Sequence, residues 1–164
     1  MIQLKHVLVA TDFSPASEVA LGYGRELARS FKATLHVIHV VDELAAHVMS
    51  PNSASLNMGH LQVALEKEGS VALEALLTDE DRKTIGARAT LVTAHNPAAA
   101  ILSYASENVV DVIIVGTHGR SGLAHVLMGS VAEKIVRSAP CPVLTVRHPE
   151  HEFLRPDALE AVAP

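Results

Sequence analysis

Short apolar runs alternate along the chain with longer segments in which apolar residues recur at helical spacing. A run of roughly four to eight apolar residues between turn signals is typical of a buried strand. Five such runs predict strands: His6–Ala10, Thr34–Val41, Ala87–Thr93, Val112–Val115 and Val143–Arg147. The fourth run is apolar throughout, as a strand buried on both faces requires. Strands that alternate with helices in this way predict an α/β fold built on a parallel sheet.

Clear helix signals lie in two of the segments between these strands. Ser14–Pro15 provides a cap and a first turn, and the apolar residues that follow continue at helical spacing to Phe31. Asn96–Pro97 begins a second helix in the same way, and its apolar residues continue to about Glu107.

The middle of the chain gives weaker signals. Residues 56–77 place apolar side chains on one helical face, although Glu68 interrupts that face and Gly69–Ser70 is a candidate kink. The charged residues 78–86 predict an exposed connection. Residues 42–57 show no clean period and predict a loop with one short helical turn at 44–49. That loop is either a lid over a ligand or an idle connector.

A glycine-rich loop separates the fourth strand from the last helix. It contains Gly116, Gly119 and Gly129, and glycine lets a ligand approach the backbone closely. Ser130 and Glu133 then fit a capping box at the start of the helix. Because exposed amides at a helix N-terminus attract anions, the loop predicts a phosphate site, with a plain strand-to-helix turn as the alternative. It lacks the lysine of a Walker loop, and its glycines are too widely spaced for the dinucleotide fingerprint.

The spacing Gly-x-x-Gly-x9-Gly-Ser, followed by a helix and Pro140-Cys141-Pro142, resembles the universal stress protein family, in whose ATP-binding branch it is the nucleotide motif. Thr11-Asp12-Phe13-Ser14 and the run 36–42 are similar to that family as well, so the resemblance covers nearly all of residues 5–147. It implies a domain at 1–147 and a C-terminal tail or arm at 148–164. It also implies an open, mostly parallel five-stranded sheet in the order 3-2-1-4-5 with helices on both faces, a Rossmann-like fold of the adenine nucleotide α-hydrolase-like type.

The same resemblance implies binding roles for individual residues. Thr11 and Asp12 are expected to line the nucleoside end of a ligand that lies beyond the carboxyl ends of the strands. The backbone near Val40 and Val41 is expected to contact the adenine edge, and Gly116 the ribose. The implied cofactor-binding residues are Thr11, Asp12, Val40, Val41, Gly116, Thr117, His118, Gly119, Arg120, Gly129, Ser130 and Val131. For Asp12 the alternative is that its carboxylate only holds the turn or caps the next helix.

The composition of the chain argues against some binding partners and favours one cellular compartment. The 164 residues carry a formal charge of −5 and only 3% aromatic residues, which argues against nucleic acid as a partner. No uncharged apolar run is long enough to span a membrane, and the first strand begins too early to leave room for a signal peptide. A single cysteine excludes an internal disulfide and fits the cytoplasm, and we interpret Cys141 as a packing residue.

The ten histidines do not predict a metal site formed by protein side chains, because metal ligands must converge on one point. His36 and His39 lie three apart on a strand, so they are expected to point to opposite faces. The family resemblance implies a nucleotide as the cofactor, ATP or else ADP or AMP, with or without the Mg²⁺ that bound polyphosphate usually keeps.

The last strand predicts an interface between two copies of the chain. An apolar strand at the edge of a sheet invites pairing, and two-fold dimers are the commonest assembly. The family resemblance implies a homodimer centred on Val143, Leu144, Thr145 and Val146. The alternative is that the C-terminal tail folds over this edge.

Three functions remain open. The first is a cytoplasmic protein that binds ATP or another adenine nucleotide and acts as a stress-response or regulatory module on an unidentified protein partner. The second is a dimeric interaction module that needs no nucleotide. The third is a slow ATPase or self-phosphorylating enzyme, although no motif for a general base or nucleophile supports turnover and no catalytic residue is predicted.

Overall fold

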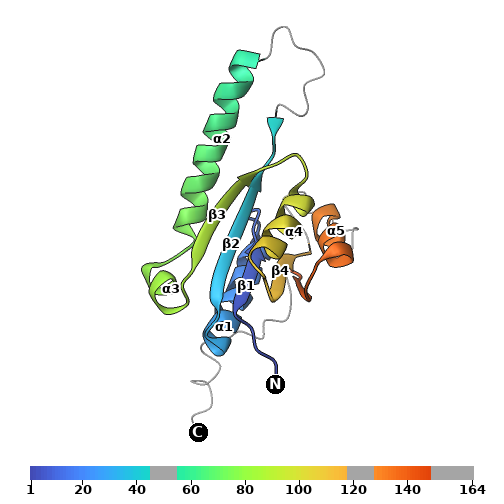
Figure 1. Ribbon diagram of the computed structural model, residues 1–164. Helices are drawn as coiled ribbons and strands as arrows, with labels where there is room; N and C mark the ends of the chain where they lie inside the picture. The colour runs from blue at the N-terminus through green and yellow to red at the C-terminus, as the bar shows by residue number, and fades with distance from the viewer. Residues whose placement is uncertain (45–54, 118–127, 149–164) are drawn as a thin grey trace.

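A computed structural model of the chain describes residues 1–44, 55–117 and 128–148. Its elements, in chain order, are β1 (His6–Ala10), α1 (Pro15–Phe31), β2 (Thr34–Val41), α2 (Ser55–Ala75), α3 (Asp79–Thr84), β3 (Arg88–Thr93), α4 (Pro97–Glu107), β4 (Val112–Gly116), α5 (Ser130–Ser138) and β5 (Val143–Val146). Neighbouring strands pair in parallel, in the order β3-β2-β1-β4-β5. The predicted α/β fold and its strand order are confirmed (Figure 1).

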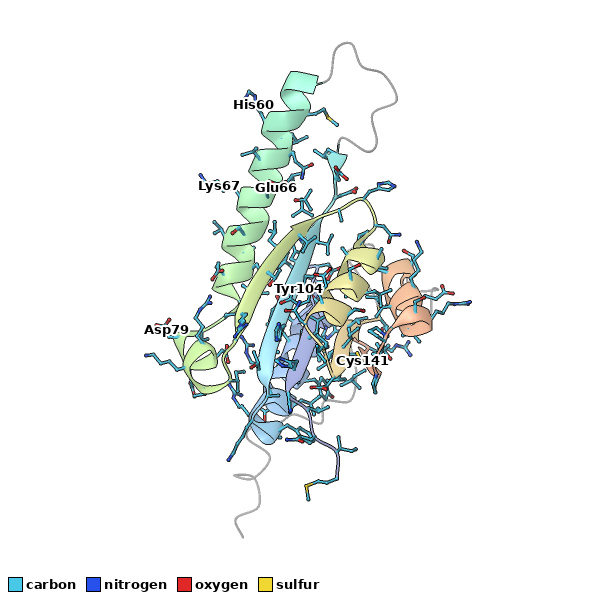
Figure 2. All side chains as sticks on the ribbon, in the orientation of Figure 1. His60, Glu66, Lys67, Asp79, Tyr104 and Cys141 are labelled. Atoms are coloured by element: carbon cyan, nitrogen blue, oxygen red, sulfur yellow. The ribbon has the colours of Figure 1, made fainter. Side chains whose placement is uncertain are left out.

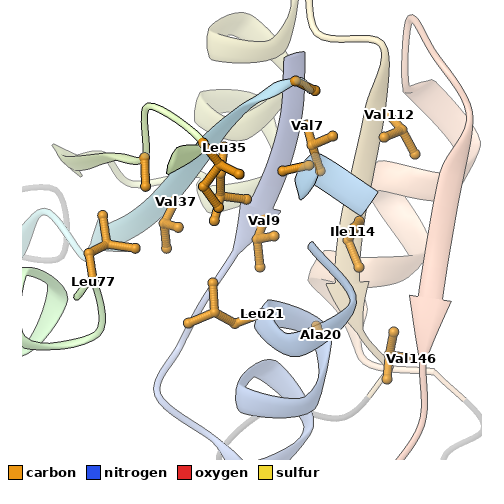
Figure 3. Packing of buried hydrophobic residues seen from close by; sticks show 14 of the residues in the cluster. Val7, Val9, Ala20, Leu21, Leu35, Val37, Leu77, Val112, Ile114 and Val146 are labelled. Carbon is orange, nitrogen blue, oxygen red and sulfur yellow. The ribbon is translucent and has the colours of Figure 1, made fainter. Parts of the chain in front are cut away.

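Helices cover both faces of the sheet. On one face, Leu21 of α1 and Leu73 of α2 belong to the buried cluster around Val9 of β1 (Figure 3). On the other face, Ile101 of α4 and Ile135 of α5 belong to a second buried cluster. Both clusters draw on the same central strands, because successive side chains of a strand point to opposite faces. The sheet is therefore buried on both sides, as its apolar strands require.

Two buried histidines of β2 lie on opposite faces, as their spacing predicts. His36 faces α4, where its Nδ1 lies 2.9 Å from the hydroxyl of Tyr104, which Figure 2 labels beside that helix. Its Nε2 lies 3.2 Å from Nδ1 of His6. His39 faces α2, where its Cδ2 would lie 3.3 Å from a Cβ built at Gly69. The two rings belong to different cores and cannot share a ligand.

Residues 78–86 are mostly exposed, as predicted, but they contain the helix α3 and a buried carboxylate, which the sequence analysis did not predict. Thr78 caps α3 through its hydroxyl, and the carboxylate of Asp81 accepts a hydrogen bond from the Thr78 amide at 3.1 Å. Asp81 is only 1% exposed because it also pairs with Arg25 at 3.0 Å and Arg29 at 3.4 Å, both from α1. Burial alone raises its pKa, but the hydrogen bonds from Thr78 and the charge of Arg25 hold that pKa below its usual range. Asp81 thus fastens α3 to α1.

The long helix α2 runs unbroken through Gly69, where the sequence suggests a kink. A Cβ at this position would lie 3.0 Å from Cδ1 of Leu91, so the glycine allows α2 to approach β3 closely. The third strand begins one residue later and the last ends one residue earlier than predicted. None of the helices in the described ranges has the length and apolar character needed to cross a membrane.

Replacing Asp81 by alanine removes half of the capping box of α3 and both ion pairs to α1. We expect the free energy of unfolding to fall by about 2 to 4 kcal/mol, since charge-assisted hydrogen bonds and part of a cap are lost. Glu74→Gln is the matched control, because it removes an exposed pair with Arg82 and should cost less than about 1 kcal/mol. Urea unfolding at pH 7 measures both, and equal losses would contradict the anchoring role of Asp81.

A pH dependence of stability follows from His36. Burial, with the nearby charges of His6 and Arg88, lowers the pKa of His36 from 6.5 to about 4. Between these pH values the unfolded chain binds a proton that the folded protein does not. The free energy of unfolding should therefore fall as the pH drops through this window, by about 3 kcal/mol in total. Urea unfolding measured at several pH values should show a flatter dependence for His36→Gln, and an unchanged slope would assign the effect to another group.

Candidate functional site

A cavity of about 180 Å³ lies beyond the carboxyl ends of β1, β2 and β4, between the sheet and the helices α4 and α5. Its lining residues are Ala10, Thr11, Asp12, Ile38, His39, Val40, Pro97, Ile101, Val115, Gly116, Val131, Ala132 and Ile135. Most of these lining residues are apolar. The polar ones are Thr11, Asp12 and His39, and the ring of His39 itself lies on the α2 side of the sheet. The cavity lies where β1 has β2 on one side and β4 on the other, which is where ligands bind in open α/β sheets.

The structure brings together five of the residues that the sequence predicts for a site. Thr11, Asp12, Val40, Gly116 and Val131 all line the cavity.

Other predicted site residues lie elsewhere. Val41 borders a second cavity of about 420 Å³ on the α2 side, and it does not line the first. Thr117, Gly129 and Ser130 are in the described ranges but do not line the first cavity. The predictions for His118, Gly119 and Arg120, for the helical turn at 44–49 apart from its first residue, and for the tail after 148 fall outside the described residues.

Gly116 ends β4 against the first turn of α1. A Cβ at this position would lie 2.9 Å from Cβ and 3.0 Å from the carbonyl carbon of Ala16. Backbone at that distance cannot move aside easily, so any larger residue is overpacked. Packing between β4 and α1 therefore requires this glycine, whatever the cavity holds.

Asp12 holds the turn between β1 and α1 and also borders the cavity. Its Oδ1 accepts hydrogen bonds from the amide of Ser14 at 3.1 Å and from the Ser14 hydroxyl at 2.6 Å. The Ser14 hydroxyl oxygen in turn accepts from the amide of Ser17 and caps α1, as the sequence predicts. The turn-holding role is thus present in the structure, and the same residue lines the cavity.

A hydrogen bond joins the two described ends of the glycine-rich loop. The amide of Gly129 donates to the carbonyl of Thr117 at 2.6 Å, and the amide of Thr117 donates to the carbonyl of Val146 at 2.7 Å. Gly129 is the N-cap of α5, and no side-chain hydrogen bond caps this helix within the described ranges. The predicted capping box of Ser130 and Glu133 is therefore wrong, because Ser130 already has helical geometry and Gly129 occupies the cap.

Sequence reasoning missed several wall residues that come from the helices. Pro97 and Ile101 of α4, with Ala132 and Ile135 of α5, close the cavity from above the sheet. The apolar spacing of these helices is visible in the sequence, but only the three-dimensional arrangement shows that they cover the crevice. His39 is a different case, since a polar residue inside an apolar strand is a signal that the sequence does contain.

Neither a reactive thiol nor a metal site is supported by the described residues. Burial, with the nearby charge of Asp111, raises the pKa of the Cys141 thiol, which disfavours the reactive thiolate. Across residues 1–44, 55–117 and 128–148, no group of three or more His, Cys, Asp and Glu side chains could hold a metal ion.

Relatives of the chain are found at both the sequence and the structure level. A family model described as the universal stress protein family matches residues 3–147. The chain is 34% identical to universal stress protein YxiE of Bacillus subtilis over 145 residues, which cover 86% of this chain and 97% of the relative. It is 31% identical to universal stress protein MJ0531 of Methanocaldococcus jannaschii over 148 residues, which cover 90% and 85%.

Solved structures agree with this assignment. The protein MJ0577 of Methanocaldococcus jannaschii superposes with a TM-score of 0.73 at 26% identity, covering 92% of this chain and 100% of that chain. A universal stress family protein from Burkholderia pseudomallei superposes with a TM-score of 0.68 at 29% identity, covering 87% and 95%. Sequence and fold thus agree over almost the whole described chain, and the protein belongs to the universal stress protein family.

Proposed function

We propose that the cavity beyond β1 and β4 binds the base of an adenine nucleotide, with ATP as the first ligand to test. The observation that carries this proposal is a mostly apolar cavity at the strand-order reversal, with Asp12 among its lining residues. At about 180 Å³ it is smaller than the pockets of roughly 300 to 1,000 Å³ that enclose whole drug-sized ligands, so it suits a single ring system. The sugar and phosphates then lie outside it, past Asp12 and Gly116.

The N-terminus of α5 supports a position for the phosphates. Val131, in the first turn, lines the cavity, and the exposed Ser130 precedes it. The first amides of a helix have no partner within the helix, and they carry the positive end of its dipole. We therefore assign the phosphates to the amides of Ser130 and Val131 and to the Ser130 hydroxyl. The Gly129 amide joins them only if its bond to Thr117 opens.

Solved structures of the same fold support this class of ligand. One universal stress protein was determined in complex with cAMP, at 24% identity and a TM-score of 0.56 to this chain. Another, from Archaeoglobus fulgidus, was determined in complex with dAMP, at 21% identity and a TM-score of 0.57. At such identities the likeness concerns the fold, and the nucleotide itself is to be identified by titration.

We also propose that the protein acts in the cytoplasm as a nucleotide-dependent regulatory module and works as a homodimer. The geometry of β5, an edge strand, supports the dimer. The carbonyls of Pro142 and Val146 accept hydrogen bonds from the β4 side. Because alternate residues direct their backbone groups to the same side, those of Val143 and Thr145 point away from β4. A second copy that pairs along this edge would satisfy them.

Filling the cavity from α5 should weaken nucleotide binding. Val131→Phe places a larger side chain in the wall, so we expect the affinity for ATP and AMP to fall at least about tenfold, or 1.4 kcal/mol. Val136→Phe is the matched control, since Val136 lies on the same helix, is similarly exposed and does not line the cavity. Isothermal titration calorimetry of nucleotide-free protein with ATP, ADP, AMP and GTP measures these affinities. Absence of adenine nucleotide binding at millimolar concentration, or equal losses in both variants, would sink the proposal.

Removing an outward backbone donor of β5 should break the dimer. Thr145→Pro deletes an amide that points away from β4, and an edge strand tolerates proline on that side. We expect the wild-type protein to sediment as a dimer and this variant as a folded monomer. Leu144→Ala is the control, because it trims a side chain but keeps every backbone group. A monomeric wild-type protein, or a Thr145→Pro variant that stays dimeric, would rule out this interface.

A further inference from the structure

One polar side chain of β2 faces the layer of α1 and α2. The residues of β2 on that side are Leu35, Val37, His39 and Val41, and His39 is only 8% exposed. Its Nδ1 lies 2.8 Å from the carbonyl oxygen of Thr11, just past the end of β1. Because a carbonyl can only accept, Nδ1 carries the proton and donates it, which fixes the state of this nitrogen.

Thr11 is held by β2 through both of its backbone groups. Its amide donates to the carbonyl of Ile38 at 2.9 Å, and its carbonyl accepts from His39. The ring of His39 also packs against the ring of Phe13, with centroids 4.4 Å apart and planes tilted by 46°. Both chain neighbours of Asp12 therefore contact the same imidazole.

The conformation of Phe13 shows why such a contact matters. Its φ is 63°, in the left-handed region, which costs a bulky residue on the order of 1 to 3 kcal/mol. A strained residue persists only where its surroundings hold it. The Phe13 amide donates to the Thr11 hydroxyl oxygen at 3.0 Å, and the ring rests on His39. Asp12, the middle residue of this turn, lines the cavity.

We propose that His39 is the positioning residue of the nucleotide site. By holding the Thr11 carbonyl with Nδ1–H and supporting the Phe13 ring, it fixes Asp12 between them in the conformation that faces the ligand. The inference rests on the proposed function of the cavity. It differs from a packing role, in which any side chain that fills the same volume would serve.

Two substitutions at this position separate the two roles. His39→Leu keeps the volume and removes the donor, so we expect affinity for AMP to fall about tenfold, the equivalent of one hydrogen bond. His39→Asn loses most of the ring but can place its side-chain N–H where Nδ1 lies. We expect its affinity to stay within about threefold of the wild type, although its free energy of unfolding falls as a small cavity is created. Calorimetric titration and urea unfolding of the same samples give both quantities.

His36→Leu is the matched control, because His36 is the other buried histidine of β2 and does not line the cavity. It should lose stability and keep its affinity for AMP. The inference is overturned if His39→Leu binds like the wild type, or if the affinities of the Leu and Asn variants simply follow their stabilities.

A readout that needs no nucleotide keeps this test distinct from the proposed function. In ¹H–¹⁵N spectra of the nucleotide-free protein, both variants lose the ring beside Phe13, so the Asp12 amide is the reporter. His39→Leu should shift this amide, and His39→Asn should keep it nearer its wild-type position. If the wild type does not bind AMP, the proposed function fails, and this shift still reports whether His39 positions the turn. An unshifted Asp12 amide in His39→Leu would overturn the positioning role by itself.

Discussion

The site depends on the parallel pairing of β1 with β2 on one side and with β4 on the other. After β1 the chain enters α1 on one face of the sheet, and after β4 the next described helix, α5, lies on the opposite face. The two helices therefore lie on opposite faces and leave a crevice at the strand ends. Gly116 packs against Ala16 so closely that no ligand fits between β4 and the first turn of α1. The cavity of the proposed site lies on the other face, against α4 and α5.

Much of this arrangement is present in the sequence, because it depends on local patterns. The apolar runs of β1 and β2 and the cap-plus-proline starts of α1 and α4 give their boundaries to the residue. The features that the sequence does not reveal, such as the burial of Asp81 and the cap of α5, depend on contacts between residues far apart in the chain. In the sequence Asp81 resembles the exposed charged residues around it. In the structure it is buried, because it forms ion pairs with Arg25 and Arg29 of α1. Ser130 has the sequence pattern of a cap, but in the structure Gly129 is the N-cap of α5 and its amide donates to Thr117.

At the site too, local patterns are visible in the sequence and long-range contacts are not. The Thr-Asp turn and the glycines could be read from the sequence, because their spacing resembles a known family. The sequence presents His39 only as a candidate metal ligand. It does not reveal the hydrogen bond to Thr11, because that bond joins one strand to the end of another. In the structure Asp12, His39 and Val40 border both cavities, so the turn after β1 forms their common wall. Its rigidity determines the shape available to a ligand on either side.

We propose that the cavity between the sheet and α4 and α5 receives an adenine base. A crystal structure of the protein grown with AMP would show where the base lies. The adenine ring is expected between Val115 and Ile101, with the ribose near Asp12 and Gly116 and the phosphate at the first turn of α5. A nucleotide bound elsewhere, or an empty cavity in crystals grown at millimolar AMP, would contradict it.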